Sequence, residues 1–196
     1  MTNLAALILA GGQSQRMGQD KALLELAGES LLQRTCQVAL SCTPQTFVVT
    51  PWPQRYQAAV PASVGWIQEP VAARGPLIGF AQGLRALGQP DWVLLLACDM
   101  PYLEGRVLQH WQAQLDQIPP AAIAALPRSA KGWEPLCGFY RYAALASLER
   151  AIAHNICAFQ RWLATETVAA LAAEPRLLTN CNTPEQWQQI IRQSHA

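Results

Sequence analysis

Short, continuously apolar segments alternate along this chain with longer segments whose apolar residues recur every three or four positions. Continuous runs that stop at glycine or proline are typical of buried strands, whereas the longer spacing is typical of helices that cover a sheet. The alternation predicts an α/β fold with an open, mainly parallel sheet that carries helices on both faces, as in Rossmann-like domains. The predicted strands span 4–10, 45–50, 63–67, 91–97, 121–126 and 136–140, and the predicted helices 29–42, 77–87, 104–115, 142–153 and 184–193.

Composition narrows the class of protein. Of the 196 residues, 51% are hydrophobic and no change in composition divides the chain, so we expect a single domain over residues 1–196. Only 14% of the residues are charged and the formal net charge is +1, which gives no field that would attract nucleic acid or an anionic membrane. The apolar runs are shorter than the roughly 20 residues of a membrane helix, and the first one lacks the basic leader of a signal peptide. We therefore expect a cytoplasmic protein that binds neither nucleic acid nor membrane.

The cysteines and histidines give no sign of a disulfide framework or a zinc site. The three histidines are not spaced as metal ligands, either with each other or with cysteine. Because free cysteine is usually buried, the cysteines are expected to be small core residues in a reducing compartment. They are Cys36, Cys42, Cys98, Cys137, Cys157 and Cys181.

The segment Leu9–Lys21 (LAGGQSQRMGQDK) follows the first predicted strand and has the features of a phosphate-binding loop. Gly11 and Gly12 can adopt backbone angles that other residues avoid, so their N–H groups can approach a ligand closely. Arg16 offers a planar charge for phosphate and Lys21 a point charge. The spacing fits neither the dinucleotide fingerprint G-x-G-x-x-G nor the P-loop, in which lysine directly follows the last glycine. The alternative is that the two cations are solvated charges in a polar surface loop.

Asp99 follows the strand predicted over 91–97, where an ionised carboxylate is costly unless it meets a cation. A magnesium ion would meet that need, because Mg²⁺ prefers oxygen ligands and often binds one or two carboxylates together with substrate phosphates. Ligands bind outside the carboxyl ends of parallel strands, so Asp99 and the glycine loop are expected to share one sheet edge. The alternative is that Asp99 caps the next helix, since Pro101 lies two residues on. The segment Gly75–Gly79 (GPLIG) is either a loop that lets backbone approach a flat base or a turn that feeds a helix.

These motifs resemble those of the nucleotidyltransferases, and specifically of the molybdenum cofactor guanylyltransferases, which join GMP to molybdopterin. Leu9–Lys21 resembles the nucleotide-binding signature of that family, and Gly75–Gly79 resembles its guanine-side loop. Residues 98–103 (CDMPYL) resemble its metal motif, and residues 180–185 (NCNTPE) resemble its C-terminal motif. The resemblance extends over nearly the whole chain and implies a Rossmann-like nucleotidyltransferase fold.

The resemblance also implies a role for each matching position. Arg16, Lys21 and Asp99 would be catalytic, and Asp99 would also bind Mg²⁺. Asn180 and Asn182 would lie on the molybdopterin side of the site. The positions assigned to nucleotide binding are Leu9, Ala10, Gly11, Gly12, Lys21, Thr50, Glu69, Gly75, Pro76, Leu77 and Asp99.

Two of these positions depart from the family pattern. Thr50 stands where the family often has Asn, and Glu69 stands where it often has Asp. Thr50 keeps a hydroxyl and Glu69 keeps the charge, so each is expected to reach the ribose or the base. By analogy alone, Trp133, Glu134 and Pro135 are placed near the acceptor substrate.

The implied reaction transfers GMP from GTP to the terminal phosphate of molybdopterin and releases pyrophosphate. That phosphate is largely dianionic near neutral pH because its second pKa is about 6, so it needs little help from a general base. The expected substrates are GTP and molybdopterin, the expected cofactor is Mg²⁺, and cofactor-biosynthesis proteins and apo-molybdoenzymes are possible transient partners. One alternative is a molybdenum cofactor cytidylyltransferase or another small-molecule nucleotidyltransferase. The other is a non-catalytic nucleotide-binding protein that delivers the cofactor.

Overall fold

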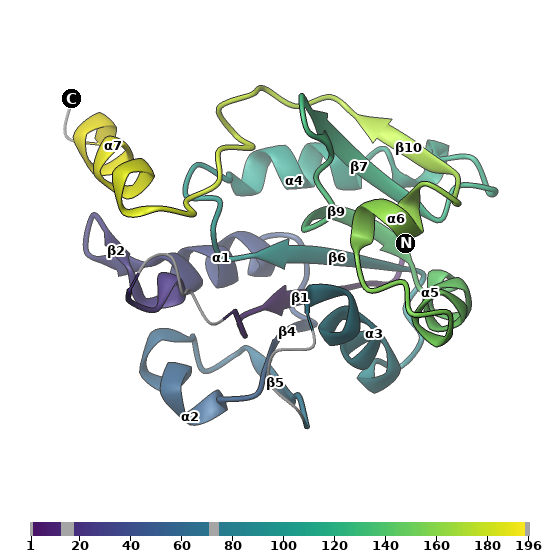
Figure 1. The fold of residues 1–196 in the computed structure, drawn as a ribbon, viewed down its shortest axis with the longest axis horizontal. Coiled ribbons are helices and arrows are strands. Elements are labelled where there is room, and N and C mark those ends of the chain that lie inside the picture. The colour runs from purple at the N-terminus through teal and green to yellow at the C-terminus, as the bar shows by residue number, and fades with distance from the viewer. Residues whose placement is uncertain (1, 13–17, 71–74, 195–196) are drawn as a thin grey trace.

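An eight-stranded sheet runs through the centre of the computed structural model, which describes residues 2–12, 18–70 and 75–194 (Figure 1). The order across the sheet is β10-β7-β9-β6-β1-β4-β5, and β8 pairs with β7 off this path. Strand β9 is antiparallel to β6 and β7, whereas the other pairs along the path are parallel. The prediction of an open, mainly parallel sheet is therefore confirmed. The strands are β1 (Leu4–Leu9), β4 (Thr46–Thr50), β5 (Gly65–Gln68), β6 (Trp92–Ala97), β7 (Ala124–Ser129), β8 (Gly132–Trp133), β9 (Cys137–Arg141) and β10 (Val168–Leu171).

Helices cover both faces of this sheet because successive residues of its central strands point to opposite sides. In β1, Leu4, Ala6 and Ile8 pack into the core on the side of α1 and α4, while Ala5 and Leu7 pack on the side of α3 and α5. A strand buried in this way reads as a continuous apolar run, which is why β1 and β6 were predicted correctly. The helices are α1 (Leu31–Leu40), α2 (Pro53–Tyr56), α3 (Pro76–Ala86), α4 (Gly105–Gln112), α5 (Ala144–Ala153), α6 (Phe159–Leu163) and α7 (Pro184–Ser194).

Several short elements were not predicted from the sequence. The periodicity of α2 and α6 extends over too few residues to be read. Strand β10 is mostly alanine, a poor strand former, and owes its conformation to parallel pairing with β7. The other short elements are the hairpin strands β2 (Glu25–Leu26) and β3 (Glu29–Ser30), and the 3₁₀ turns η1 (Lys21–Leu23), η2 (Gln57–Ala59) and η3 (Leu115–Gln117).

A small third core joins the C-terminal helix to the β2–β3 hairpin, beside the main domain. Trp187 and Ile190 of α7 pack with Leu24, Leu26 and Leu31. Figure 1 shows α7 (yellow) beyond the ends of β1 and β6, close to β2. The packing therefore brings the last part of the chain to the edge of the sheet at which the central strands end.

All six cysteines are free thiols, and Cys36, Cys137 and Cys181 are buried as predicted. Burial raises the pKa of Cys36 to about 12, so this side chain stays a neutral, apolar thiol at physiological pH. Cys157 is exposed, contrary to the expectation of burial. Among the described residues, no helix combines the length and apolar character needed to cross a membrane.

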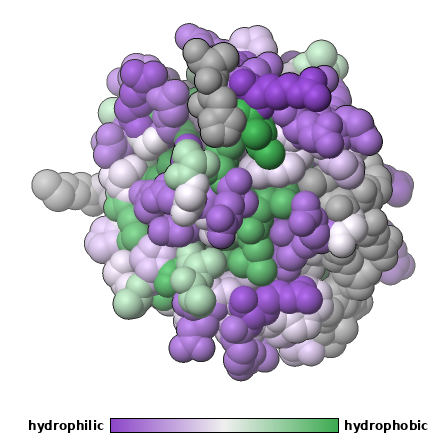
Figure 2. Space-filling view, turned by 90° about the vertical axis from the view of Figure 1, so that its left-hand side faces the viewer, coloured by the Kyte–Doolittle hydropathy of each residue, from purple (hydrophilic) through white to green (hydrophobic). Residues whose placement is uncertain are grey.

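The strand order reverses at β1: the chain adds β4 and β5 on one side of β1 and then returns to add β6 on its other side. Ligands of open α/β sheets bind at such a switch point, outside the carboxyl ends of the strands. The register places Leu9 of β1 beside Val49 of β4 and Ala97 of β6, so the segments that follow these strands start at one level. Figure 2 looks onto this side of the molecule, where hydrophobic surface lies among hydrophilic side chains. Such a mixed surface is typical of small-molecule sites.

Candidate active site

Side chains from three distant segments meet at the carboxyl edge of the sheet. The Nζ of Lys21 lies 3.4 Å from Oδ2 of Asp99 and donates a hydrogen bond of 2.7 Å to Oδ1 of Asn182. The Lys21 and Asp99 side chains are each 20% exposed, so both are largely buried but can still be reached by a ligand. The sequence indicated that the Asp99 carboxylate must meet a cation, and in this structure Lys21 provides it.

The short turn η1 holds Lys21 in place, and one carboxylate fastens that turn on two sides. Asp20 caps η1 through Oδ1, which accepts a hydrogen bond of 3.1 Å from the N–H of Ala22. Its Oδ2 accepts 2.7 Å from the hydroxyl of Tyr56 and 3.2 Å from the guanidinium of Arg55. Neither Asp20 nor Tyr56 was predicted to act at the site. The sequence offers one signal for Asp20, its position next to Lys21, and none for Tyr56.

The start of α7 places Asn182 in the cluster. Gln186 reaches back to accept hydrogen bonds from the N–H groups of Asn182 (2.7 Å) and Thr183 (3.2 Å), and its own N–H donates to Oγ1 of Thr183. This reciprocal arrangement is a capping box. The N–H of Cys181 also donates 2.7 Å to the carbonyl of Asp99, which ties the segment to the loop after β6. The predicted start of a helix at residue 184 is therefore confirmed, and Asn182 just before it contacts Lys21, while its place on the molybdopterin side stays a prediction.

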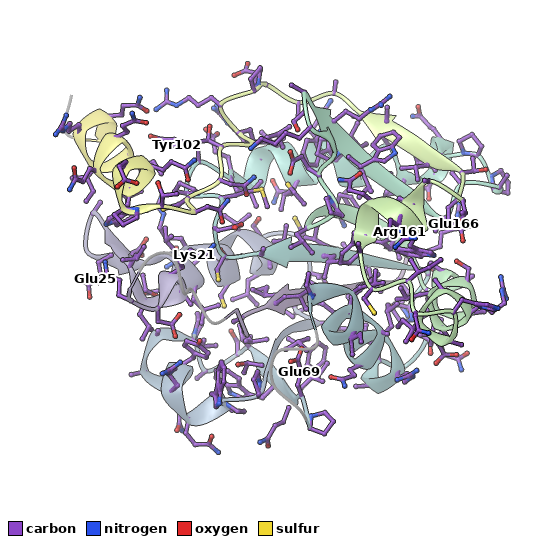
Figure 3. The ribbon with its side chains drawn as sticks, viewed as in Figure 1. Lys21, Glu25, Glu69, Tyr102, Arg161 and Glu166 are labelled. Carbon is purple, nitrogen blue, oxygen red and sulfur yellow. The ribbon has the colours of Figure 1, made fainter. Side chains whose placement is uncertain are left out.

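A second carboxylate, that of Glu69, lies at the same edge, after β5 (Figure 3). The N–H of Glu69 donates 3.0 Å to the carbonyl of Thr50, which extends the pairing of β5 with β4. Its Oε1 lies so close to Gly79 that a methyl group there would overlap it, and Oε2 lies 3.6 Å from the position that a Cβ on Gly11 would occupy. Burial raises the pKa of the Glu69 carboxyl. Only glycine at 79 leaves room for the carboxylate in this position.

Two residues predicted to contact nucleotide are fully buried. Thr50 and Leu77 are both 0% exposed. The hydroxyl of Thr50 accepts 3.2 Å from the N–H of Trp52 and so shapes the turn after β4, while Leu77 packs into the core beneath α3. This burial argues against direct contact between either side chain and a ligand, while the nucleotide-binding role of the two positions stays a prediction. Their side chains support the loops that surround the site.

The other predicted nucleotide residues surround this edge. Leu9 and Gly11 are partly exposed and Gly12 is exposed, whereas Ala10 is buried and its N–H continues the sheet by donating 3.0 Å to Val49. Beyond the glycine pair, Arg16 falls outside the described residues.

The GPLIG segment forms the start of helix α3, and its predicted contact with the base stays a prediction. Gly75 is exposed, adopts a φ of +91° that favours glycine, and precedes Pro76 at the first position of α3. Asn180, which was predicted to face the pterin, is half-buried and donates 3.5 Å to the carbonyl of Leu178.

The segment predicted to face the acceptor lies at the same edge, just before β9. The carbonyl of Leu136 accepts 3.0 Å from the N–H of Ala97, so residues 133–135 lie beyond the end of β6. Burial raises the pKa of Cys137, and the nearby carboxylates of Glu134 and Asp99 raise it further.

Asp99 is the residue that was predicted to bind a metal. Within the described part of the chain, no group of three or more His, Cys, Asp or Glu side chains could hold an ion by itself. One carboxylate with an amide oxygen near it suits Mg²⁺, which takes oxygen ligands and relies on substrate phosphates and water for the rest. The Oδ1 of Asn182 is that amide oxygen, because both it and Asp99 contact the same ammonium of Lys21. The donor set therefore fits a magnesium nucleotide.

A doubly wound sheet whose switch point carries a glycine loop, a lysine and an aspartate defines the class of α/β nucleotide-binding enzymes. Within that class, the chain belongs to the family described as MobA-like NTP transferase domain, whose pattern matches residues 6–173.

Sequence relatives and a solved structure agree with this assignment. The chain is 53% identical over 186 residues to a "Probable molybdenum cofactor guanylyltransferase" from Nostoc sp., covering 94% of this chain and 89% of the relative. It is 45% identical to a protein of the same name from Synechococcus elongatus, covering 96% and 98%. The crystal structure of molybdopterin-guanine dinucleotide biosynthesis protein A from Archaeoglobus fulgidus superposes with a TM-score of 0.78 at 23% identity, covering 97% of this chain and 98% of that one. The structural likeness supports the predicted nucleotidyltransferase fold.

Proposed function

We propose that this protein, as a single nucleotidyltransferase domain in the cytoplasm, transfers GMP from GTP to the terminal phosphate of molybdopterin and releases pyrophosphate. The observation that carries the proposal is the meeting of Lys21, Asp99 and Asn182 beyond the ends of β1 and β6. The names of the relatives at 53% and 45% identity support the same reaction. Cofactor-biosynthesis proteins and apo-molybdoenzymes are the transient partners that this product requires.

The chemical task is to bring two anions together. An oxygen of the molybdopterin phosphate forms a bond to the α-phosphorus of GTP while the bond from that phosphorus to pyrophosphate breaks. The ammonium of Lys21 carries N–H donors that contact Asp99 and Asn182, and on GTP binding it is proposed to contact a phosphate oxygen as well. Orienting two bound reactants can supply about 7 to 11 kcal/mol of the barrier, so the reaction requires no protein nucleophile. Arg16 is proposed to add a second cation beside the phosphates.

Asp99, with Asn182 beside it, would hold Mg²⁺ together with the nucleotide phosphates. When bound, the ion supplies Lewis-acid neutralisation of the charge that develops on the phosphate oxygens. The residues of the chain hold the phosphates in place: Lys21 through its ammonium, and Gly11 and Gly12 through backbone that lies at the end of β1.

Glu69 is the group that favours guanine over cytosine. A carboxylate offers two acceptor oxygens, which match the adjacent N1–H and N2–H₂ donors of guanine. Cytosine presents one donor next to a ring-nitrogen acceptor, and that acceptor would repel the second oxygen. Because burial raises the pKa of Glu69, two hydrogen bonds from guanine to the ionised form would offset a real desolvation cost. This predicts a preference for GTP over CTP.

The proposal is tested by incubating the purified protein with molybdopterin and Mg²⁺ and either GTP or CTP, and following pyrophosphate release and the mass of the product. We expect release with GTP and formation of the guanine dinucleotide. Faster release with CTP would instead indicate a cytidylyltransferase. Tight GTP binding without pyrophosphate release would indicate a protein that delivers the cofactor without chemistry.

A further inference from the structure

The Asp20 carboxylate connects the turn that carries Lys21 to the buried side chain of Tyr56. Oδ1 of Asp20 caps η1 and Oδ2 accepts 2.7 Å from the Tyr56 hydroxyl, while the Asp20 side chain is only 16% exposed. A hydrogen bond from a hydroxyl to a carboxylate is charge-assisted and stronger than one between neutral groups. The same carboxylate therefore fixes both the start of η1 and its distance from α2.

Tyr56 is a fixed anchor for this contact. It is 1% exposed, packs in the core on the α1 and α4 side, and belongs to α2, a short helix that starts at Pro53 soon after β4. Burial and the hydrogen bond to Asp20 both raise the pKa of Tyr56, so its hydroxyl keeps its proton and acts as the donor. Arg55 supports the contact from the solvent side, where it also stacks 5.2 Å over the ring of Trp52.

We propose that Tyr56 is a positioning residue for nucleotidyl transfer, which acts through Asp20 to hold Lys21 against Asp99 and Asn182. This inference rests on the proposed function, because it requires Lys21 to act on the nucleotide phosphates. Asp20 and Lys21 are adjacent in the chain, and Asp20 caps the turn that Lys21 begins. Without the Tyr56 hydroxyl, the Asp20 carboxylate loses its buried donor and keeps only the half-exposed Arg55 as its side-chain contact with α2. The turn η1 is then held less firmly, and the Lys21 ammonium loses its fixed position beside Asp99 and Asn182.

The test is Tyr56→Phe, which removes the hydroxyl and keeps the ring that fills the core. The matched control is Ser147→Ala, which also removes a hydroxyl that donates to a carboxylate, that of Glu166, at 2.5 Å. Figure 3 shows Glu166 at the end of the molecule opposite Lys21. We expect kcat for pyrophosphate release to fall roughly 10- to 100-fold in Tyr56→Phe, as for a displacement of about 1 Å at a reacting centre, and to stay near wild type in the control. Thermal unfolding of both variants checks that they fold.

A double-mutant cycle separates positioning from a general loss of structure. In a Lys21→Met background, Tyr56→Phe should change the residual rate by less than about twofold, because the group through which it acts is gone. A loss as large as in the wild-type background would overturn the proposal, since the effect would then not pass through Lys21.

Crystal structures of the wild type and of Tyr56→Phe give a measurement that does not depend on activity. We expect the Lys21 ammonium to leave its position beside Asp99 and Asn182 in the variant. An unchanged Lys21 position, or an undiminished rate in an active enzyme, would overturn the inference. Wild-type protein that released no pyrophosphate would contradict the proposed function instead, and the two crystal structures would still decide the role of Tyr56.

Discussion

Replacing Gly79 with alanine should separate the stability of this protein from its choice of base. In the structure, a Cβ at position 79 would overlap Oε1 of Glu69, whereas the other neighbour, Leu9, lies 3.8 Å away. The overlap is with the far end of a flexible side chain, so the carboxylate moves and the helix stays. To regain van der Waals contact, the Glu69 oxygen must retreat by roughly 1 Å or more.

The two consequences differ in sign. Alanine in place of glycine within α3 should stabilise the helix by about 0.8 to 1 kcal/mol, and a strained Glu69 rotamer would cost about 0.5 to 1.5 kcal/mol. The free energy of unfolding should therefore change by no more than about 1 kcal/mol.

The effect on GTP affinity is larger. A displaced carboxylate loses at least one charge-assisted hydrogen bond to guanine, which is worth about 1.5 to 3 kcal/mol. This corresponds to a roughly 10- to 150-fold weaker affinity for GTP.

Calorimetric titration with GTP and Mg²⁺, and pyrophosphate release with GTP and with CTP, measure the affinity and the base preference. Gly88→Ala is the control, because a Cβ there meets no atom within 4 Å. Adding Glu69→Asp to Gly79→Ala shortens the acidic side chain by one methylene and should restore part of the GTP affinity. If Gly79→Ala bound GTP as tightly as the wild type and kept its GTP-to-CTP ratio, the assignment of Glu69 to the base would be wrong.

Three further predictions concern the remaining groups of the site. Asp99→Ala should reduce magnesium-dependent turnover at least 100-fold, on the order seen when one electrostatic stabiliser is removed. The control Asp91→Ala, at the opposite end of β6, should leave turnover near wild type, and comparable rates in the two variants would contradict the metal assignment. Burial raises the pKa of Glu69 in the folded state, so the folded protein loses stability as the pH rises and this carboxyl ionises. In urea unfolding, Glu69→Gln should therefore be as stable as the wild type near pH 4 and more stable than it at pH 7.5. A stability difference that did not change with pH would contradict this. Gln186→Ala removes the capping box and should lower the free energy of unfolding by about 0.5 to 2 kcal/mol. It should also lower kcat, because Gln186 no longer holds Asn182 in place. An unchanged kcat would show that the cap has no part in the site.

The fold class, and the position of Asp99 and the glycine pair at one edge of the sheet, follow from the sequence alone, because both depend on local patterns. An apolar run such as residues 92–97 can be stable only where both of its faces are covered, and this identifies a central strand without knowledge of its partners. The polar residue that follows such a strand lies at the edge where ligands bind, so Asp99 and the glycine loop could be placed together. The resemblance to guanylyltransferases added residue roles that the patterns themselves did not contain.

The tertiary structure decided which of these residues touch one another. Asn182 lies 161 positions from Lys21 in the chain, and Tyr56 lies 36 positions from Asp20, so no periodicity or spacing indicates either contact. The full burial of the Thr50 side chain was not predicted for a related reason, because it depends on how β4 and the turn after it pack against their neighbours. Contacts of this kind are set by how the strands and helices pack in three dimensions. The sequence by itself determined which chemistry the edge of the sheet carries, and only the folded chain determined the position and partner of each charge.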